Sequence, residues 1–193
     1  MMTVLILVKH AMPDIDPAVP PPRWLLGAAG RYAAFQLSNE LRQYDPSVVI
    51  TSIEPKAAET GEIVGACLHA PVEQRLNLHE HERDGLPFLS DAGFHARIAT
   101  IFAHPDERVV GRESANEARS RFSRAVHQTL DDYSGDVVIV AHGTVLSLFV
   151  SGCTGIDGFD LWKRLGLPSY VVLERPGLEL ISIIDSVELL EPS

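Results

Sequence analysis

Two apolar runs that each end in a histidine constrain the fold more than any other feature of this sequence. Residues 4–8 are five consecutive aliphatic residues followed by Lys9 and His10, and the run 137–141 is followed by His142. Apolar runs without polar alternation are typical of strands buried on both faces, as in the centre of a parallel sheet. If these two strands are parallel neighbours, both histidines lie at the carboxyl edge of the sheet, where open α/β sheets bind their ligands.

The rest of the chain alternates between helical and extended patterns. Helical spacing of apolar residues predicts helices over residues 24–44, 52–67, 91–103, 113–132, 144–151 and 159–165. Short apolar runs predict further strands over residues 47–52, 71–78, 170–174 and 180–184, of which the last two flank a Pro-Gly turn as a β-hairpin. This order predicts an α/β fold, a three-layer sandwich with a mostly parallel central sheet and an antiparallel C-terminal hairpin, as a single domain over residues 1–193.

The charge of the chain limits its partners. Asp and Glu total 26 against 16 Lys and Arg, so the formal net charge is −10. A protein that binds nucleic acid or an anionic membrane needs an excess of cations, so we expect neither partner. The apolar run near the N-terminus is far shorter than a membrane span and lacks a secretory cleavage region, so we expect a cytoplasmic protein. No pattern in the sequence specifies an oligomeric state.

Two further segments are expected beside this edge of the sheet. Residues 12–23 contain five prolines, which exclude regular structure and leave either a surface connection or a partial lid that contacts the substrate. Ser52 is expected to cap the next helix, with Pro55 in its first turn. Lys56 then lies at the N-terminus of that helix, where free N–H groups and the helix dipole favour an anion.

Two groups of charged residues are interpreted without a bound ligand. Residues 79–82 hold two histidines and two glutamates, but their spacing matches no zinc pattern and no other ligand group is evident, so we expect no metal. Farther along, Glu117 and Arg121 are four residues apart in a predicted helix and are expected to form a surface ion pair.

Five short motifs occur in a definite order along nearly the whole chain. They are strand-Lys9-His10, the segment from Ser52 to Thr60, Leu78-His79-Glu80, Gly111-Arg112-Glu113-Ser114 and strand-Ala141-His142-Gly143. No single motif is specific, but their order and distances resemble the histidine phosphatase, or phosphoglycerate-mutase-like, superfamily. Residues 26–37 also resemble the helix that follows the family's first motif.

The resemblance implies hydrolysis of a small phosphorylated substrate through a phosphohistidine intermediate, with no cofactor or metal and with inorganic phosphate as a product. In this chemistry His10 is the nucleophile that attacks phosphorus, and His142 stabilises the charge on the phosphoryl oxygens. Glu80 gives its proton to the departing alkoxide, and Glu82 is the alternative acid. The residues implied to bind phosphate are Lys9, Lys56, His142 and Gly143.

Two departures from the family's pattern bear on activity. The family usually has arginine where Lys9 and Lys56 stand, and lysine keeps the charge but loses the planar fork that holds two phosphate oxygens. Arg23 or Arg83 is the alternative source of that fork. We therefore prefer a phosphatase and keep two alternatives: a degenerate, weak or inactive member that binds a phosphorylated ligand or a protein partner, and, as the weakest, a phosphomutase.

Overall fold

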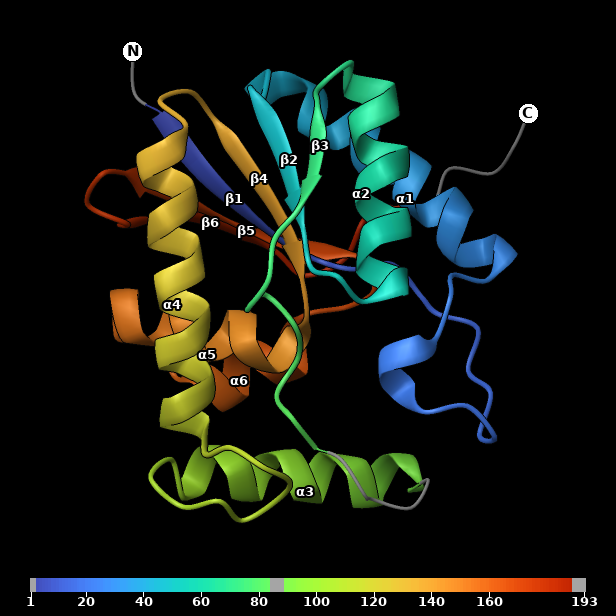
Figure 1. Cartoon of the computed structure of the whole chain (residues 1–193), viewed down its shortest axis with the longest axis vertical. Helices are drawn as coiled ribbons and strands as arrows, with labels where there is room; N and C mark the ends of the chain where they lie inside the picture. The colour runs from blue at the N-terminus through green and yellow to red at the C-terminus, as the bar shows by residue number, and fades with distance from the viewer. Residues whose placement is uncertain (1–2, 84–88, 189–193) are drawn as a thin grey trace.

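The centre of the protein is a six-stranded mixed sheet, seen in a computed structural model that describes residues 3–83 and 89–188 (Figure 1). Strands β1 to β4 run parallel to one another. Strand β5 is antiparallel to its neighbour β1, and β6 is antiparallel to β5. The predicted mostly parallel sheet with an antiparallel C-terminal hairpin is confirmed. In spatial order the strands are β3 (Val72–Gln74), β2 (Val48–Thr51), β4 (Val137–Ala141), β1 (Thr3–Lys9), β5 (Ser169–Arg175) and β6 (Leu180–Ile184).

Helices cover both faces of the sheet and give the three layers (Figure 1). On one face, α1 (Ala28–Leu41) and α2 (Pro55–Leu68) pack against Val4, Ile6 and Val8 of β1. Leu5 and Leu7 point to the opposite face, because successive side chains of a strand alternate between the faces. That face is covered by α4 (Ala115–Asp132), α5 (Gly143–Thr154) and α6 (Gly158–Arg164), while α3 (Asp91–Ala103) lies beyond the carboxyl ends of the parallel strands.

Strand register brings the two histidine motifs together. β1 and β4 are parallel neighbours, with Lys9 paired to Ala141. The backbone N–H of His10 donates to the Ala141 carbonyl at 3.0 Å. His10 and His142 therefore leave adjacent strands at the same edge of the sheet, as the sequence predicts.

The structure corrects two local expectations on the approach to this edge. The first helix begins at Ala28 rather than at residue 24, because Leu26 is extended and forms a bridge with Pro13. The N-cap of α2 is Glu54 rather than Ser52. The proline-rich loop also contains one short 3-10 turn, Pro21–Arg23. Within residues 3–83 and 89–188, no helix combines the length and the apolar character needed to cross a bilayer.

Candidate active site

His10 is the residue around which the site is built. Its side chain is buried, with 7% of the residue exposed, directly after the last residue of β1. Nδ1 lies 2.8 Å from the Ala11 carbonyl oxygen, an acceptor, so Nδ1 carries the hydrogen and Nε2 keeps its lone pair. Burial, and then the neighbouring His142 and Lys56, lower the pKa of His10 well below its usual value. The imidazole is therefore neutral near pH 7 and can act as a nucleophile.

His142 faces His10 from the end of β4. The two rings are in an edge-on arrangement with 5.2 Å between their centroids. Nε2 of His142 lies 2.9 Å from the Ser52 hydroxyl, while its buried Nδ1 has no hydrogen-bond partner in the part of the chain that the structure describes. If the Ser52 hydroxyl donates to Nε2, the ring hydrogen is on Nδ1, a donor suited to a bound anion. Burial, and then Lys56, lower the pKa of His142 well below its usual value.

Both predicted phosphate-binding lysines are buried or nearly so, and both ammonium groups have protein partners. Lys9 donates to the Leu165 carbonyl at 2.6 Å. Burial lowers the pKa of Lys9 to about 8, although the carboxylate of Glu80 partly opposes the shift. Lys56, in the first turn of α2, donates to the Pro21 carbonyl at 2.8 Å and to the Glu54 carboxylate at 2.6 Å. The proline-rich loop thus supplies a direct contact to a site residue.

Glu54 is a site residue that the sequence reasoning missed. Its side chain is 8% exposed and uses both carboxylate oxygens. Oε2 pairs with Lys56, while Oε1 accepts the backbone N–H of Glu80 at 2.9 Å and lies 3.6 Å from Nε2 of His142. The sequence does place Glu54 between a strand end and a helix start, which is where site residues of this fold are expected. A glutamate before a proline at a helix start is, however, equally typical of a residue that only caps the helix.

Glu80 occupies the N-terminus of α5 as an anion. Its carboxylate accepts backbone N–H groups from Thr144 at 3.1 Å, Val145 at 3.3 Å and His81 at 2.8 Å. Burial alone raises the pKa of Glu80, but Arg83, His142 and the N–H donors outweigh it and hold the pKa far below the usual range. The free protein therefore has Glu80 ionised, and the carboxylate takes the N–H groups that follow Gly143, the first residue of α5.

Glu82, the alternative acid, lies differently. Its side chain is 39% exposed, and its carboxylate lies 3.3 Å from Nε2 of His79. Its backbone N–H donates to Glu113 at 3.1 Å. Glu80, rather than Glu82, therefore shares contacts with Glu54 and the start of α5.

Arg83 brings a guanidinium to the same place. Its Nη1 donates to the Thr144 hydroxyl at 2.9 Å, and its Nη2 lies 3.5 Å from the Glu80 carboxylate. Arg23, the other arginine considered as a source of the fork, is exposed on the proline-rich loop. Among the two, Arg83 is the one that contacts site residues.

A largely buried arginine on α4, Arg121, fixes the segment that carries Glu80. Arg121 donates to the carbonyls of Asn77, His79 and Glu80 and to the carboxylate of Glu113, at distances from 2.6 to 3.3 Å. The expected Arg121–Glu117 surface pair is wrong, because Glu117 instead pairs with Arg108 and completes a capping box with Ser114. Arg121 is thus a support for the site and not a surface charge.

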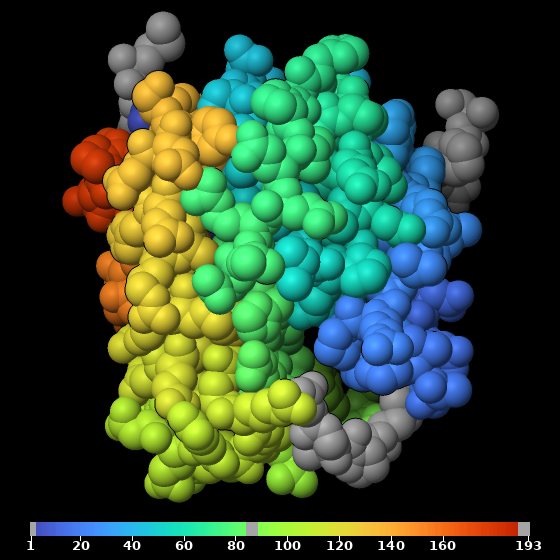
Figure 2. Space-filling model, viewed as in Figure 1, coloured from blue at the N-terminus to red at the C-terminus, as the bar shows by residue number. Residues whose placement is uncertain are grey.

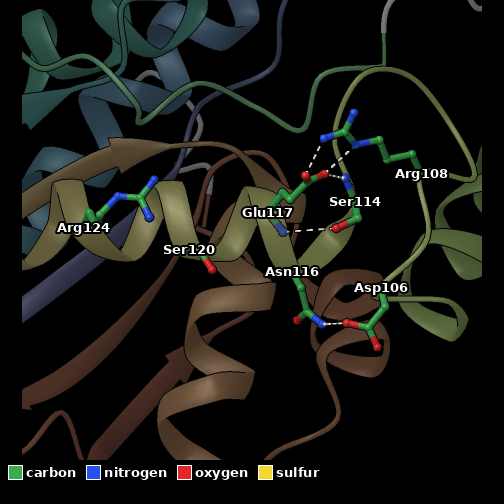
Figure 3. A pocket seen from close by; sticks show the side chains of 7 residues that line it. All are labelled: Asp106, Arg108, Ser114, Asn116, Glu117, Ser120 and Arg124. Atoms are coloured by element: carbon green, nitrogen blue, oxygen red, sulfur yellow. Dashed lines mark hydrogen bonds and ion pairs between the residues drawn. The ribbon is translucent and has the colours of Figure 1, made fainter.

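The surface has one hollow at the carboxyl edge of the sheet and another at the start of α4. Figure 2 shows one at the carboxyl edge, bordered by the proline-rich loop and by the segment after β3, with part of α3 behind it. A second, of about 460 Å³, lies at the start of α4, where Arg108 pairs with Glu117 and Asn116 with Asp106 (Figure 3). The second hollow contains none of the histidines, and of its charged residues Arg108, Glu117 and Asp106 already have side-chain partners. In the described residues no three His, Cys, Asp or Glu side chains are grouped to hold a metal ion.

A family of known proteins matches most of the sequence. The sequence model of the histidine phosphatase superfamily (branch 1) matches residues 20–177, a range that begins after Lys9 and His10. A search of curated proteins found no match.

Solved structures share the fold at low sequence identity. YhfR of Bacillus stearothermophilus has a TM-score of 0.75 and 22% identity, covering 98% of this chain and 100% of that one. A mycobacterial glucosyl-3-phosphoglycerate phosphatase has a TM-score of 0.73 and 18% identity, covering 95% and 96%. A phosphoserine phosphatase of Entamoeba histolytica, solved with 3-phosphoglyceric acid, has a TM-score of 0.77 and 14% identity, covering 98% and 100%.

Proposed function

The chain belongs to the histidine phosphatase superfamily, and from this we propose that it hydrolyses phosphomonoesters through a phosphohistidine intermediate on His10. The observation that carries the proposal is the state of His10: a neutral, buried imidazole with Nδ1 held by the Ala11 carbonyl and Nε2 unprotonated, facing His142. The phosphatases among the structural neighbours support the reaction class, and the neighbour bound to 3-phosphoglyceric acid supports a small phosphorylated substrate.

In the first step, the lone pair of His10 Nε2 forms an N–P bond while the P–O bond to the alcohol breaks. The bond's electron pair leaves with the alkoxide, which takes a proton from Glu80. The Nδ1–H of His142, which has no partner among the described residues, donates to a phosphoryl oxygen and offsets the charge that develops there.

In the second step, a water molecule attacks the phosphorus of the phosphohistidine. The N–P bond breaks, its electron pair returns to His10, and the carboxylate of Glu80 receives a proton from the water. Inorganic phosphate leaves, and both side chains recover their starting states.

The protonation state of Glu80 limits the first step. The free protein favours the carboxylate, whereas protonating an alkoxide requires the acid. A phosphate dianion bound beside Glu80 adds a like charge and raises its pKa, and an Arg83 that turns towards the phosphate removes one cation that lowers it. Esters whose alcohol departs without a proton are therefore the easier substrates.

Phosphate binding in this proposal uses three cations, Lys9, Lys56 and Arg83. Each lysine donates as a compact ammonium, and Arg83 supplies the planar fork that both lysines lack. Gly143 lets the chain approach closely, because a Cβ there would lie 3.1 Å from Cε of Lys9.

One observation favours the alternative of a member that binds phosphate with little or no turnover. Lys56 is already neutralised by Glu54 at 2.6 Å, so a substrate must compete with an internal anion for it. Such a protein would bind inorganic phosphate without consuming an ester.

Hydrolysis of para-nitrophenyl phosphate separates the two functions. The phosphatase predicts phosphate release that is lost in His10→Ala, together with an acid-labile phosphoryl group on His10 after rapid quench and peptide mass analysis. Equal rates in the two proteins, or a label on a serine, would contradict the assignment. Phosphate binding without release of nitrophenol would support the alternative.

A further inference from the structure

Three aromatic side chains, Phe94, Trp162 and Phe159, form an aromatic wall beside the cations of the site. Phe94, in the first turn of α3, is 38% exposed, and the guanidinium of Arg83 lies 5.3 Å from its ring centroid. Behind it, the Trp162 indole is 5.8 Å from Phe94 and stacks on Phe159 at 5.9 Å. Buried Trp162 thus supports Phe94, which leaves part of the Phe94 ring accessible.

Gly143 lies close both to the aromatic wall and to Lys9. A Cβ added at Gly143 would lie 3.3 Å from Nε1 of Trp162 and 3.4 Å from Nζ of Lys9. Arg83 makes the second connection, because it contacts both Phe94 and Thr144, the residue after Gly143. A group that extends from a phosphate held by Arg83 therefore reaches the Phe94 ring.

The charged side chains at the site leave little positive charge to bind a second anionic group. In the free protein Lys9, Lys56 and Arg83 stand against Glu54 and Glu80, so the formal excess is one positive charge, and it becomes two when Glu80 is protonated for the first step. A phosphate dianion uses all of this charge. A substrate that carries a carboxylate beside its phosphate would bring more negative charge than the pocket can balance.

We propose that the substrate is a phosphomonoester whose alcohol portion carries a planar, uncharged aromatic group, and that this group packs on Phe94. This inference rests on the proposed function, because it assumes that phosphate occupies the pocket between His10 and Arg83. Face-on or edge-on packing on an aromatic ring, together with the apolar area removed from water, favours such a group over a short alkyl chain. Esters of acidic aromatic alcohols also suit a site whose acid is ionised in the free protein.

Binding of phosphonates tests the inference apart from turnover, because their C–P bond is not hydrolysed. The probes are benzylphosphonate, propylphosphonate and the carboxylated phosphonopropionate, measured by calorimetry at one pH and ionic strength. We expect benzylphosphonate to bind about tenfold more tightly than propylphosphonate. Phosphonopropionate should bind no more tightly than propylphosphonate.

Phe94→Ala identifies the surface responsible. In this variant the advantage of benzylphosphonate should fall to within about threefold, while the affinity for propylphosphonate stays near that of the unaltered protein. Phe35→Ala is the matched control, because Phe35 is a 44% exposed phenylalanine on α1. It should change none of the three affinities.

Three outcomes would overturn the inference: no preference for the benzyl group, a preference for phosphonopropionate, or an equal loss of all three ligands in Phe94→Ala. The last outcome would limit Phe94 to positioning Arg83. If phosphonates show the expected order while para-nitrophenyl phosphate is not hydrolysed, the proposed catalysis fails and the binding inference stands.

Discussion

Replacing Glu54 by glutamine tests whether an internal anion competes with phosphate. The amide has nearly the same shape, and its oxygen can still accept the backbone N–H of Glu80, which Glu54 accepts at 2.9 Å. The charge that faces Lys56 at 2.6 Å is lost. Without a ligand, Lys56 in the variant is a buried cation with no ion-pair partner among the described residues.

Two effects of opposite sign are expected. Removing one partner of a buried ion pair costs about 3 kcal/mol of unfolding free energy, since the Pro21 carbonyl still accepts from Lys56. For a domain of this size that lowers Tm by about 6–12 °C. Phosphate binding becomes stronger instead. One charge on the phosphate and the charge on Glu54, taken as about 8 Å apart, repel by about 2 kcal/mol at an effective dielectric constant near 20. Removing that repulsion tightens phosphate binding by about tenfold to thirtyfold.

Thermal unfolding with and without inorganic phosphate, together with calorimetric Kd values, measures both effects. Phosphate should raise the Tm of Glu54→Gln more than that of the unaltered protein, because the ligand supplies the missing anion. Glu62→Gln is the control, since it removes an exposed carboxylate from the same helix, α2. If Glu54→Gln binds phosphate no more tightly than Glu62→Gln and unfolds at the same temperature without ligand, Glu54 does not act as an internal anion.

Three further predictions concern protonation. Because the pKa of His10 lies well below 6.5, kcat/KM should not fall between about pH 7.5 and 6, and a decline centred near 6.5 would show that burial does not control this histidine. Lys9 has a pKa of about 8, so it is charged below that pH and neutral above it; phosphate affinity should weaken as pH rises through 8. Lys9→Arg should retain the affinity to about pH 10, because a guanidinium keeps its proton there, and an unchanged alkaline loss would exclude Lys9 as the cause. Glu80→Gln should slow alkyl phosphates at least about tenfold more than para-nitrophenyl phosphate, with Glu82→Gln measured in parallel; equal slowing of both esters by Glu80→Gln would indicate a structural role.

Strand-end residues were the predictable part of the site. The apolar runs before His10 and His142 identify buried parallel strands, and parallel neighbours end at one edge. Lys56 follows by the same argument, because α2 starts where β2 ends. These placements depend on local pattern and on sheet topology, both of which the sequence expresses directly.

The partners of residues placed by long-range contacts were not predictable. Arg83 was one of two candidates for the fork, but its contact with Thr144 spans 61 positions of sequence, and the contact of Arg121 with the Asn77 carbonyl spans 44. Serine is a residue type that often caps helices, yet the Ser52 hydroxyl contacts His142 because strands β2 and β4 are neighbours. Local propensity cannot indicate which of several polar partners a side chain will meet once the loops fold back on the sheet.

If Lys9 and Lys56 stand where the family usually has arginine, as their motifs predict, their neighbours indicate how the missing planar fork is replaced. Lys56 fits between the Pro21 carbonyl and the Glu54 carboxylate as a compact ammonium with three donors. These are its two hydrogen bonds within the described residues, which leaves one N–H for a phosphoryl oxygen. The planar fork that a lysine cannot provide is present in Arg83, whose guanidinium lies 3.5 Å from the Glu80 carboxylate and over the Phe94 ring. In the proposed function, bidentate phosphate contact therefore moves from the motif positions to the segment that carries the acid. Because the same segment meets the aromatic wall, recognition of the phosphate and of the alcohol portion is coupled through one side chain.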